Sequence, residues 1–450
     1  MPPSQNRKTL LACFWLLAPV VLGQEKTPLE RNDIQQILER LERIEQENRN
    51  LAAEVRALRE QLSTRAQPQP APEAQPPLEE RAAVQEQRVE EMAQTKVEAS
   101  QKFPIKLTGT LLFNSFLNGR ANGGSQYPTI AALTDNHTTG GASFTQSLIG
   151  FLYDGPKIWG GGKVNGSLLL DLSGGSSAPL NHLVRLHVAR LSVDWKNQSI
   201  TVAQDKPIFS PREPDSLAQV AVSPLTGAGN PWLWQPQVRF EQRFAVGEQT
   251  GVKAQVGVYQ TAEPIPSTGA DPSSRPGFEG RFELWRDVGR GARIEIAPGF
   301  HASQTHVAGV SIPSRLFSID WMIRPLPKVQ LTGLFFNGKN AGGMGGLRQG
   351  FTIRDDVNFI AIRTTGGWSQ ISYQATSRLG LNLFAGQESY PQQDLLKAMI
   401  SRNFSYGGNA IFRLAPNWLL SLEASQVRTR YVSRPNRLNN HYDLALAYLF

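Results

Sequence analysis

The stretch VRFEQRF, residues 238–244, alternates apolar and charged side chains, so as a strand it has one oily face and one charged face. The apolar face carries Val238, Phe240 and Phe244, and the charged face carries Arg239, Glu241 and Arg243. A soluble sheet would present the charged face to bulk water. A transmembrane barrel turns that face toward a wet lumen and gives the apolar face to lipid.

The same alternation recurs in other segments. Phe282 and Leu284 oppose Arg281 and Glu283, and Ile294 and Ile296 oppose Arg293 and Glu295. At the C-terminus the residues that share one face are Tyr442, Leu444, Leu446, Tyr448 and Phe450. This repetition favours an all-β antiparallel transmembrane barrel over residues 103–450, with a soluble all-β domain as the alternative.

Connection lengths predict the number of strands. Seven short turns alternating with eight long connections give sixteen strands, with eighteen as the alternative. The count of sixteen treats 357–377 as one strand, bulged at Gly366-Gly367. The short turns are 154–161, 196–198, 246–250, 287–291, 325–328, 378–380 and 414–417. The long connections are 118–142, 174–181, 207–236, 263–276, 303–313, 338–356, 389–400 and 431–439.

Residues 1–23 have the pattern of a secretory signal peptide. Arg7 and Lys8 precede the apolar stretch 10–22, and cleavage is expected before Gln24. A lipoprotein signal ending at Cys13, which is the only cysteine, is the alternative. Export excludes disulfide or thiol chemistry in the mature chain if Cys13 is removed with the leader.

Two further segments precede the barrel. Residues 24–65 contain a heptad pattern over 29–63, which predicts a periplasmic coiled coil. Asn48 at a core position favours a dimer, whereas the isoleucines favour more strands, so both remain open. Residues 66–102 read as a Pro-rich spacer followed by a short helical linker.

The basic residues are concentrated in the barrel region. Residues 101–450 contain 33 basic and 22 acidic residues, an excess of +11. In an exported protein this excess indicates anionic solutes or lipopolysaccharide phosphates as partners, and not nucleic acid.

Five tryptophans lie in or beside the predicted short turns. Indole rings favour the membrane–water interface, so these residues are predicted to form a periplasmic aromatic girdle. They are Trp159, Trp195, Trp285, Trp321 and Trp418.

Several motifs are similar to those of known porins. The ending HYDLALAYLF (441–450) resembles the terminal strand recognised by the outer-membrane barrel insertion machinery. ITVAQDKPIFSP (200–211) followed by PQVRFEQRF (236–244) is similar to a strand–loop–strand passage of porins. The whole pattern resembles the phosphate-selective porin superfamily, especially its DcaP-like trimeric branch.

This resemblance implies a bacterial outer-membrane protein that forms a homotrimer, with one pore per subunit. It also implies an external loop that folds inward to narrow each pore. Phosphate specificity is not implied, because here arginine and glutamate are mixed on the strands and lysines are few.

Pore-lining charges are the candidate functional residues. Alternation places in the lumen Arg239, Glu241, Arg243, Arg281, Glu283, Arg293, Glu295, Arg413 and Glu423. The longest internal connection, 207–236, is the candidate constriction loop, with Lys206, Arg212, Glu213 and Asp215 as its charged residues. Its Pro and Trp content would also suit a loop that clamps a neighbouring subunit.

No motif indicates catalysis, a metal or a cofactor. The six histidines show no ligand spacing, and there is no G-x-S-x-G elbow or Walker loop. The sequence therefore predicts a non-enzymatic porin for small hydrophilic solutes that prefers anions such as carboxylates or phosphate. The alternatives are an anchor that ties the membrane to the cell wall through the coiled coil, and an outer-membrane hydrolase.

Overall fold

The computed structural model describes Gln46, residues 104–135, 137–175 and 183–260, the backbone of 270–271, and residues 275–355 and 358–450. The chain divides into two compact units, Met1–Glu91 and Met92–Phe450. Apart from Gln46, which is helical, the predicted leader, coiled coil and spacer lie outside the described residues. No helix among the described residues has the length and hydropathy needed to span a membrane.

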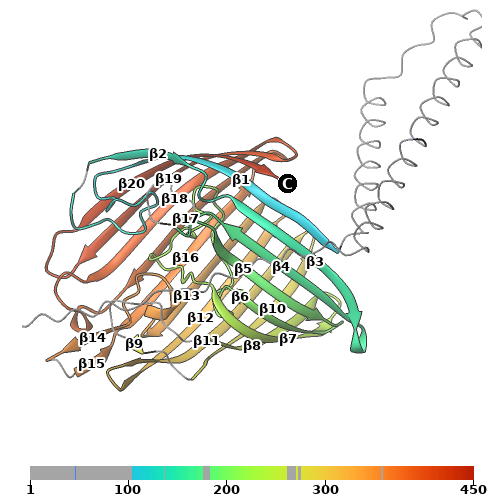
Figure 1. Cartoon of the computed structure of the whole chain (residues 1–450), viewed down its shortest axis with the longest axis horizontal. Helices are drawn as coiled ribbons and strands as arrows, with labels where there is room; N and C mark the ends of the chain where they lie inside the picture. The colour runs from blue at the N-terminus through green and yellow to red at the C-terminus, as the bar shows by residue number, and fades with distance from the viewer. Residues whose placement is uncertain are drawn as a thin grey trace, which may run out of the picture. The chain divides into compact units, whose positions relative to one another are not determined.

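The second unit is a closed barrel of 16 antiparallel strands (Figure 1). The first eight are β1 (Ile105–Asn118), β3 (Leu148–Ile158), β4 (Gly162–Asp171), β5 (Arg185–Asp194), β6 (Gln198–Asp205), β7 (Gln235–Gly247), β8 (Thr250–Tyr259) and β10 (Gly277–Gly289). The last eight are β11 (Ala292–Val307), β12 (Val310–Leu326), β13 (Val329–Lys339), β16 (Arg363–Gln374), β17 (Leu379–Ser389), β18 (Ile400–Ala415), β19 (Trp418–Tyr431) and β20 (Arg437–Leu449).

Pairing of β20 with β1 closes the barrel, with Thr110 opposite Leu449 and Asn118 opposite His441. Closure leaves no free edge, so the ladder can satisfy the backbone polar groups without water. Four shorter strands lie in the connections: β2 (Thr139–Ser143), β9 (Ala270–Asp271), β14 (Phe351–Arg354) and β15 (Asn358–Ala361).

The strand count of sixteen is confirmed. The segment 357–377, predicted as one strand, is interrupted at Ile362: its first part, β15, pairs with β14 in a hairpin, and only β16 belongs to the barrel wall. The bulge expected at Gly366-Gly367 is absent, because β16 pairs with β13 and β17 without a register shift. The two glycines serve packing instead. A Cβ on Gly366 would come within 2.5 Å of Phe336, and one on Gly367 within 2.6 Å of the Leu334 carbonyl oxygen.

The seven short turns lie where the sequence predicts them, but the long connection at 303–313 is wrong. β11 and β12 extend through this stretch and meet at Ala308-Gly309, whose φ angles are 47° and 77°. Positive φ at both central residues is typical of a type I′ hairpin turn. Ala-Gly is a weaker signal for that turn than Asn-Gly, so the local sequence does not predict that the two strands continue to this turn.

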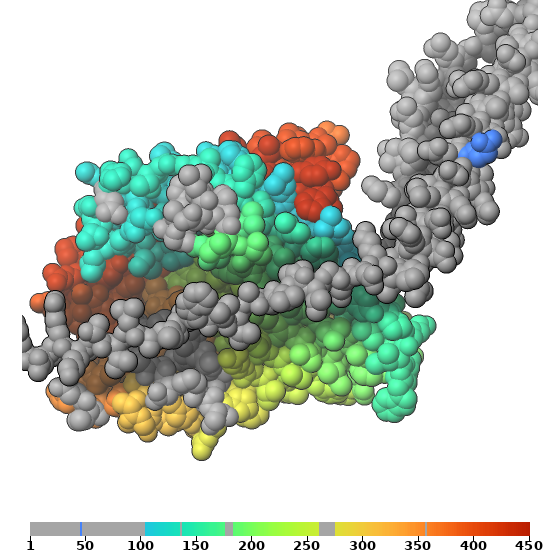
Figure 2. All heavy atoms as spheres, viewed as in Figure 1, coloured from blue at the N-terminus to red at the C-terminus, as the bar shows by residue number. Residues whose placement is uncertain are grey.

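Burial in the barrel wall is inverted relative to a soluble protein. On β10, Phe282 and Leu284 are 46% and 54% exposed, whereas Arg281 and Glu283 are 2% and 5% exposed. Figure 2 shows the outer surface of the barrel, on which the first half of the barrel is cyan and green and the second half is orange and red. Exposed apolar side chains outside and buried charges inside are the arrangement that lipid around a polar lumen stabilises.

Candidate functional site

The connection between β6 and β7, residues 206–234, folds into the barrel interior and contacts several parts of the wall. We call it the inward loop. On one side, the Ile208 amide donates to Glu279 at 2.6 Å. On other sides, Ser216 donates to Glu423 at 2.5 Å, and Asn403 donates to the Gly227 carbonyl at 2.8 Å. These contacts join β10, β19 and β18, so the loop crosses the lumen of its own barrel.

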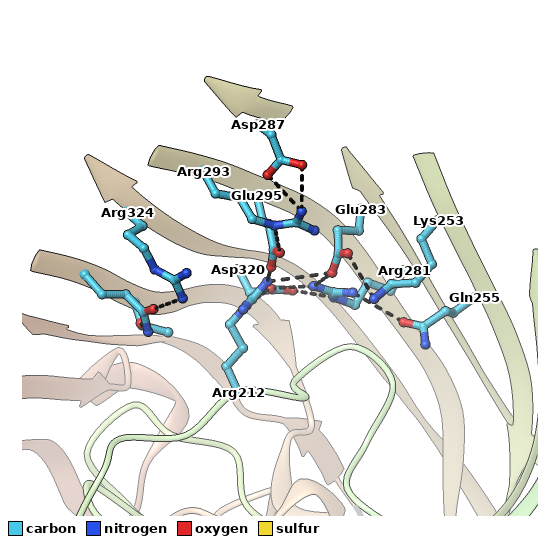
Figure 3. Close-up of polar contacts among 12 residues, drawn as sticks. Arg212, Lys253, Gln255, Arg281, Glu283, Asp287, Arg293, Glu295, Asp320 and Arg324 are labelled. Carbon is cyan, nitrogen blue, oxygen red and sulfur yellow. Dashed lines mark hydrogen bonds and ion pairs between the residues drawn. The ribbon is translucent and has the colours of Figure 1, made fainter. Parts of the chain in front are cut away.

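Arg212 connects this loop to a network of charges on β10, β11 and β12 (Figure 3). Its Nε donates to Oδ1 of Asp320 at 2.6 Å, and its Nη2 donates to Oε2 of Glu295 at 2.6 Å. Asp320 also accepts two bonds from Arg281, at 2.6 and 2.8 Å. Bidentate guanidinium–carboxylate pairs of this kind fix both distance and orientation.

The same network continues toward the short turns. Arg293 pairs with Glu295 at 2.7 Å and with Asp287 at 3.0 Å. Lys253 and Arg281 pair with Glu283 at 2.9 and 2.7 Å. The positive charges in this part of the lumen are therefore largely compensated by carboxylates.

Seven of the nine predicted pore-lining residues line one hollow of about 560 Å³, which we call the paired hollow. They are Arg239, Glu241, Arg243, Arg281, Glu283, Arg293 and Glu295. Arg212 also lines this hollow, so the structure brings the predicted constriction loop to the predicted wall charges.

Two of the predicted residues, Arg281 and Glu423, lie on the inner face but are enclosed by their neighbours. Arg281 is only 2% exposed because Asp320 and Glu283 enclose its guanidinium, so it holds the wall together and presents little surface to a solute. Glu423 is 4% exposed because Ser216 and Asn409 donate to it beneath the inward loop. Alternation predicted which face each residue occupies but not what would cover that face.

Arg413 lies in a second hollow of about 410 Å³. This hollow lies near the short turns that join β12 to β13, β16 to β17 and β18 to β19. This basic hollow is also lined by Arg324, Lys328 and Arg378, together with Asp215 of the inward loop. None of these four cations forms an ion pair with a carboxylate of the described residues. The basic hollow thus differs from the paired hollow in having an uncompensated positive charge.

The remaining predicted loop residues make internal contacts. Lys206 and Glu213 pair with each other. The Asp215 carboxylate accepts a bond of 2.6 Å from Gln370, and its amide donates to the same side chain at 2.8 Å. Burial of Asp215 raises the pKa of its carboxyl above the usual value, and the neighbouring Glu213 adds to this shift.

Three further residues of the site, Asp320, Lys253 and Arg324, are not among the predicted pore-lining residues. Asp320 lies between Ile319 and Trp321 and is fully buried. The alternation that identified Arg281 would also have placed Asp320 in the lumen, so the signal was present.

The tryptophans separate into different environments. The Trp418 ring lies 5.1 Å from the ring of outward Tyr448, tilted by 50°. Trp195 donates to the Trp159 carbonyl at 3.2 Å, and Trp159 itself is 90% exposed. Trp321 alternates with buried Asp320 and Met322, which places it on the outer face. Trp285 contradicts the girdle prediction, because it shares the inner face with Arg281 and Glu283 and lies 4.8 Å from the Arg293 guanidinium.

One set of side chains has the residue types of a hydrolase triad. His301 lies 3.0 Å from Glu279 and 3.1 Å from the Ser303 hydroxyl. However, His301 is 2% exposed, contacts the Tyr259 hydroxyl at 2.7 Å and packs against Phe209. A substrate has no access to this histidine, and Glu279 instead receives the amide of the inward loop.

Among the described residues there is no cluster of three or more side chains that could hold a metal ion.

Comparisons with known proteins agree at the level of the fold. The outer membrane channel DcaP of Acinetobacter baumannii is similar over 77% of this chain and 97% of its own, with a TM-score of 0.61 and 14% identity. An anion-selective porin from Comamonas acidovorans is similar over 77% and 99%, with a TM-score of 0.50 and 11% identity. No family model and no curated protein sequence matches the chain.

Proposed function

We propose that this chain is an outer-membrane porin through which small hydrophilic solutes diffuse passively, with a preference for anions such as carboxylates or phosphate. A closed barrel with an apolar outer wall, a polar lumen and an inward loop supports the channel function. The two similar structures are described as an outer membrane channel and an anion-selective porin, which supports the same assignment.

The basic hollow is the observation that carries the anion preference. Arg324, Lys328, Arg378 and Arg413 line it with Asp215 as the single carboxylate. A cavity with low-dielectric walls and one sign of charge raises the local concentration of the opposite ion. The predicted selectivity therefore arises more from these cations than from the compensated charges of the paired hollow.

The proposed setting is the bacterial outer membrane, with a homotrimer as the assembly and the N-terminal coiled coil in the periplasm. The terminal strand β20, with apolar residues on its outer face and Phe450 at its end, supports insertion by the barrel machinery. In the closed barrel the Phe450 carbonyl accepts a bond of 2.9 Å from the Gly109 amide.

Reconstitution in a planar bilayer tests the function. A tenfold KCl gradient across the purified full-length protein should give a reversal potential of the sign expected for chloride preference. Removing two cations with Arg378→Gln and Arg413→Gln should lower the anion-to-cation permeability ratio several-fold, because a unit charge about 8 Å away in water changes local ion concentrations about twofold.

Arg286→Gln is the matched control, since Arg286 is an exposed arginine on the outer face of β10. It should leave the permeability ratio unchanged. Absence of conductance would defeat the porin assignment, and a clear cation preference would defeat only the anion preference.

A further inference from the structure

Three arginines project from the outer face of the barrel, away from the lumen. Arg402 on β18 and Arg428 and Arg430 on β19 alternate with inward-facing buried residues such as Asn403 and Thr429. They line a groove of about 560 Å³ on the barrel wall, together with Phe404 and Leu438. These arginines play no part in the proposed pore.

The arginines lie at the height where the apolar outer wall ends. Trp418 and Tyr448 contact each other at the short-turn end of β19 and β20, with their rings tilted by 50°. From Trp418 to Arg428 is about ten residues, or about 33 Å of strand, which a tilt of about 40° reduces to about 25 Å of height. This equals the usual height of the apolar band, about 25 Å, so Arg428 lies at its outer edge and Arg402 and Arg430 lie in the headgroup layer.

The arrangement of charge is unfavourable without an anion. Arg402 lies directly opposite Arg430 in the β18–β19 ladder, and like charges in that position destabilise a sheet. None of the three arginines forms an ion pair with a carboxylate in the part of the chain that the structure describes. Arg428 is held in place by Gln426 at 2.6 Å and lies 5.6 Å from the Tyr406 ring.

We propose that this groove binds a phosphorylated glycolipid of the outer leaflet, with its phosphate between Arg402 and Arg430. Guanidinium groups bind phosphate bidentately, and a phosphate placed there converts the repulsion of the two arginines into attraction. The acyl chains of the same molecule lie along the apolar side chains below, Phe404, Tyr406 and Leu438. The apolar part of the groove selects a lipid over a free phosphate ion.

Thermal unfolding of the purified full-length protein in non-ionic detergent tests this proposal, with bis-phosphorylated lipid A as the probe. Lipid A should raise the Tm of the wild type, and dephosphorylated lipid A should not. The double variant Arg402→Gln/Arg430→Gln should bind lipid A at least tenfold more weakly, whereas Arg286→Gln, an outer-face arginine near the other rim, should bind it as the wild type does.

A comparison of the Tm of the wild type and the double variant, with and without lipid A, distinguishes lipid binding from a merely structural role of the arginines. In detergent alone the double variant should be at least as stable as the wild type, because the like-charge contact is gone. With lipid A the wild type should become the more stable protein. Conductance of the double variant should remain that of the wild type, so this test and the test of the porin assignment fail independently.

Three results would overturn the proposal. The first is an equal Tm rise with inorganic phosphate alone, which would indicate a free-anion site. The second is a change in oligomeric state of the double variant without lipid A, which would indicate a contact between copies of the chain. The third is equal lipid A affinity in the double variant and the wild type.

Discussion

The contact of Arg212 with the barrel wall should decide whether the inward loop stays in the lumen, and Arg212→Met tests this. The substitution keeps an unbranched side chain about as long as the aliphatic part of arginine and removes both charged hydrogen bonds, to Asp320 and to Glu295. Methionine cannot replace either bond, so the loop loses its ionic connection to β11 and β12.

The expected magnitude follows from the neighbours of the two carboxylates. A hydrogen bond to a charged group contributes about 1.5–3 kcal/mol, and the Arg212 side chain is only 17% exposed. Stranding a buried charge would cost more, about 3–5 kcal/mol. Here Asp320 keeps Arg281 and Glu295 keeps Arg293. We therefore expect loop docking to weaken by about 2–4 kcal/mol, or roughly 30- to 700-fold in the population of the undocked loop.

Hydrogen exchange of the backbone amides of Ile208 and Asp215 measures this population, because both amides are anchored to the wall. Arg293→Met is the matched control, since Arg293 contacts Glu295 from the wall and does not touch the loop. Protection of the two amides should fall by the stated factor only in Arg212→Met. A change below about threefold, or equal changes in both variants, would refute the role of Arg212.

Two further outcomes are expected. Gly229→Ala should destabilise the barrel or prevent its assembly, because φ at Gly229 is 94° and a Cβ would lie 2.2 Å from the Gly367 carbonyl oxygen. Heat-modifiability on gels would show this loss of folded barrel. Gly247→Ala is the control and should fold normally, because there is open space around Gly247. The connection between β17 and β18 should loosen as the pH falls below about 4, because a hydrogen bond from Arg363 holds the pKa of Asp394 below its usual value. A carboxyl whose pKa is lower in the folded state stabilises that state at pH values above its unfolded pKa, and this contribution is lost as the pH falls through the folded pKa. Hydrogen exchange of residues 390–399 should show this loss. Asp394→Asn should show a loose connection at every pH.

The barrel and the facing of its residues followed from sequence because alternation is a local property of a strand. VRFEQRF predicts its two faces without any tertiary information, and the same rule would have recovered Asp320. The turn at Ala308-Gly309 was missed because its φ angles are set by the pairing of β11 with β12 rather than by a strong local signal.

What alternation cannot supply is the partner of each inward side chain. The sequence by itself determined a polar interior with arginines and glutamates, since that depends only on which face a residue occupies. Only the tertiary structure decided that Arg281 and Glu423 are enclosed while Arg324, Lys328, Arg378 and Arg413 lack carboxylate partners among the described residues. The physical reason is that charge compensation depends on groups brought together by barrel closure and by the inward loop, at distances of a few ångströms that no local spacing encodes.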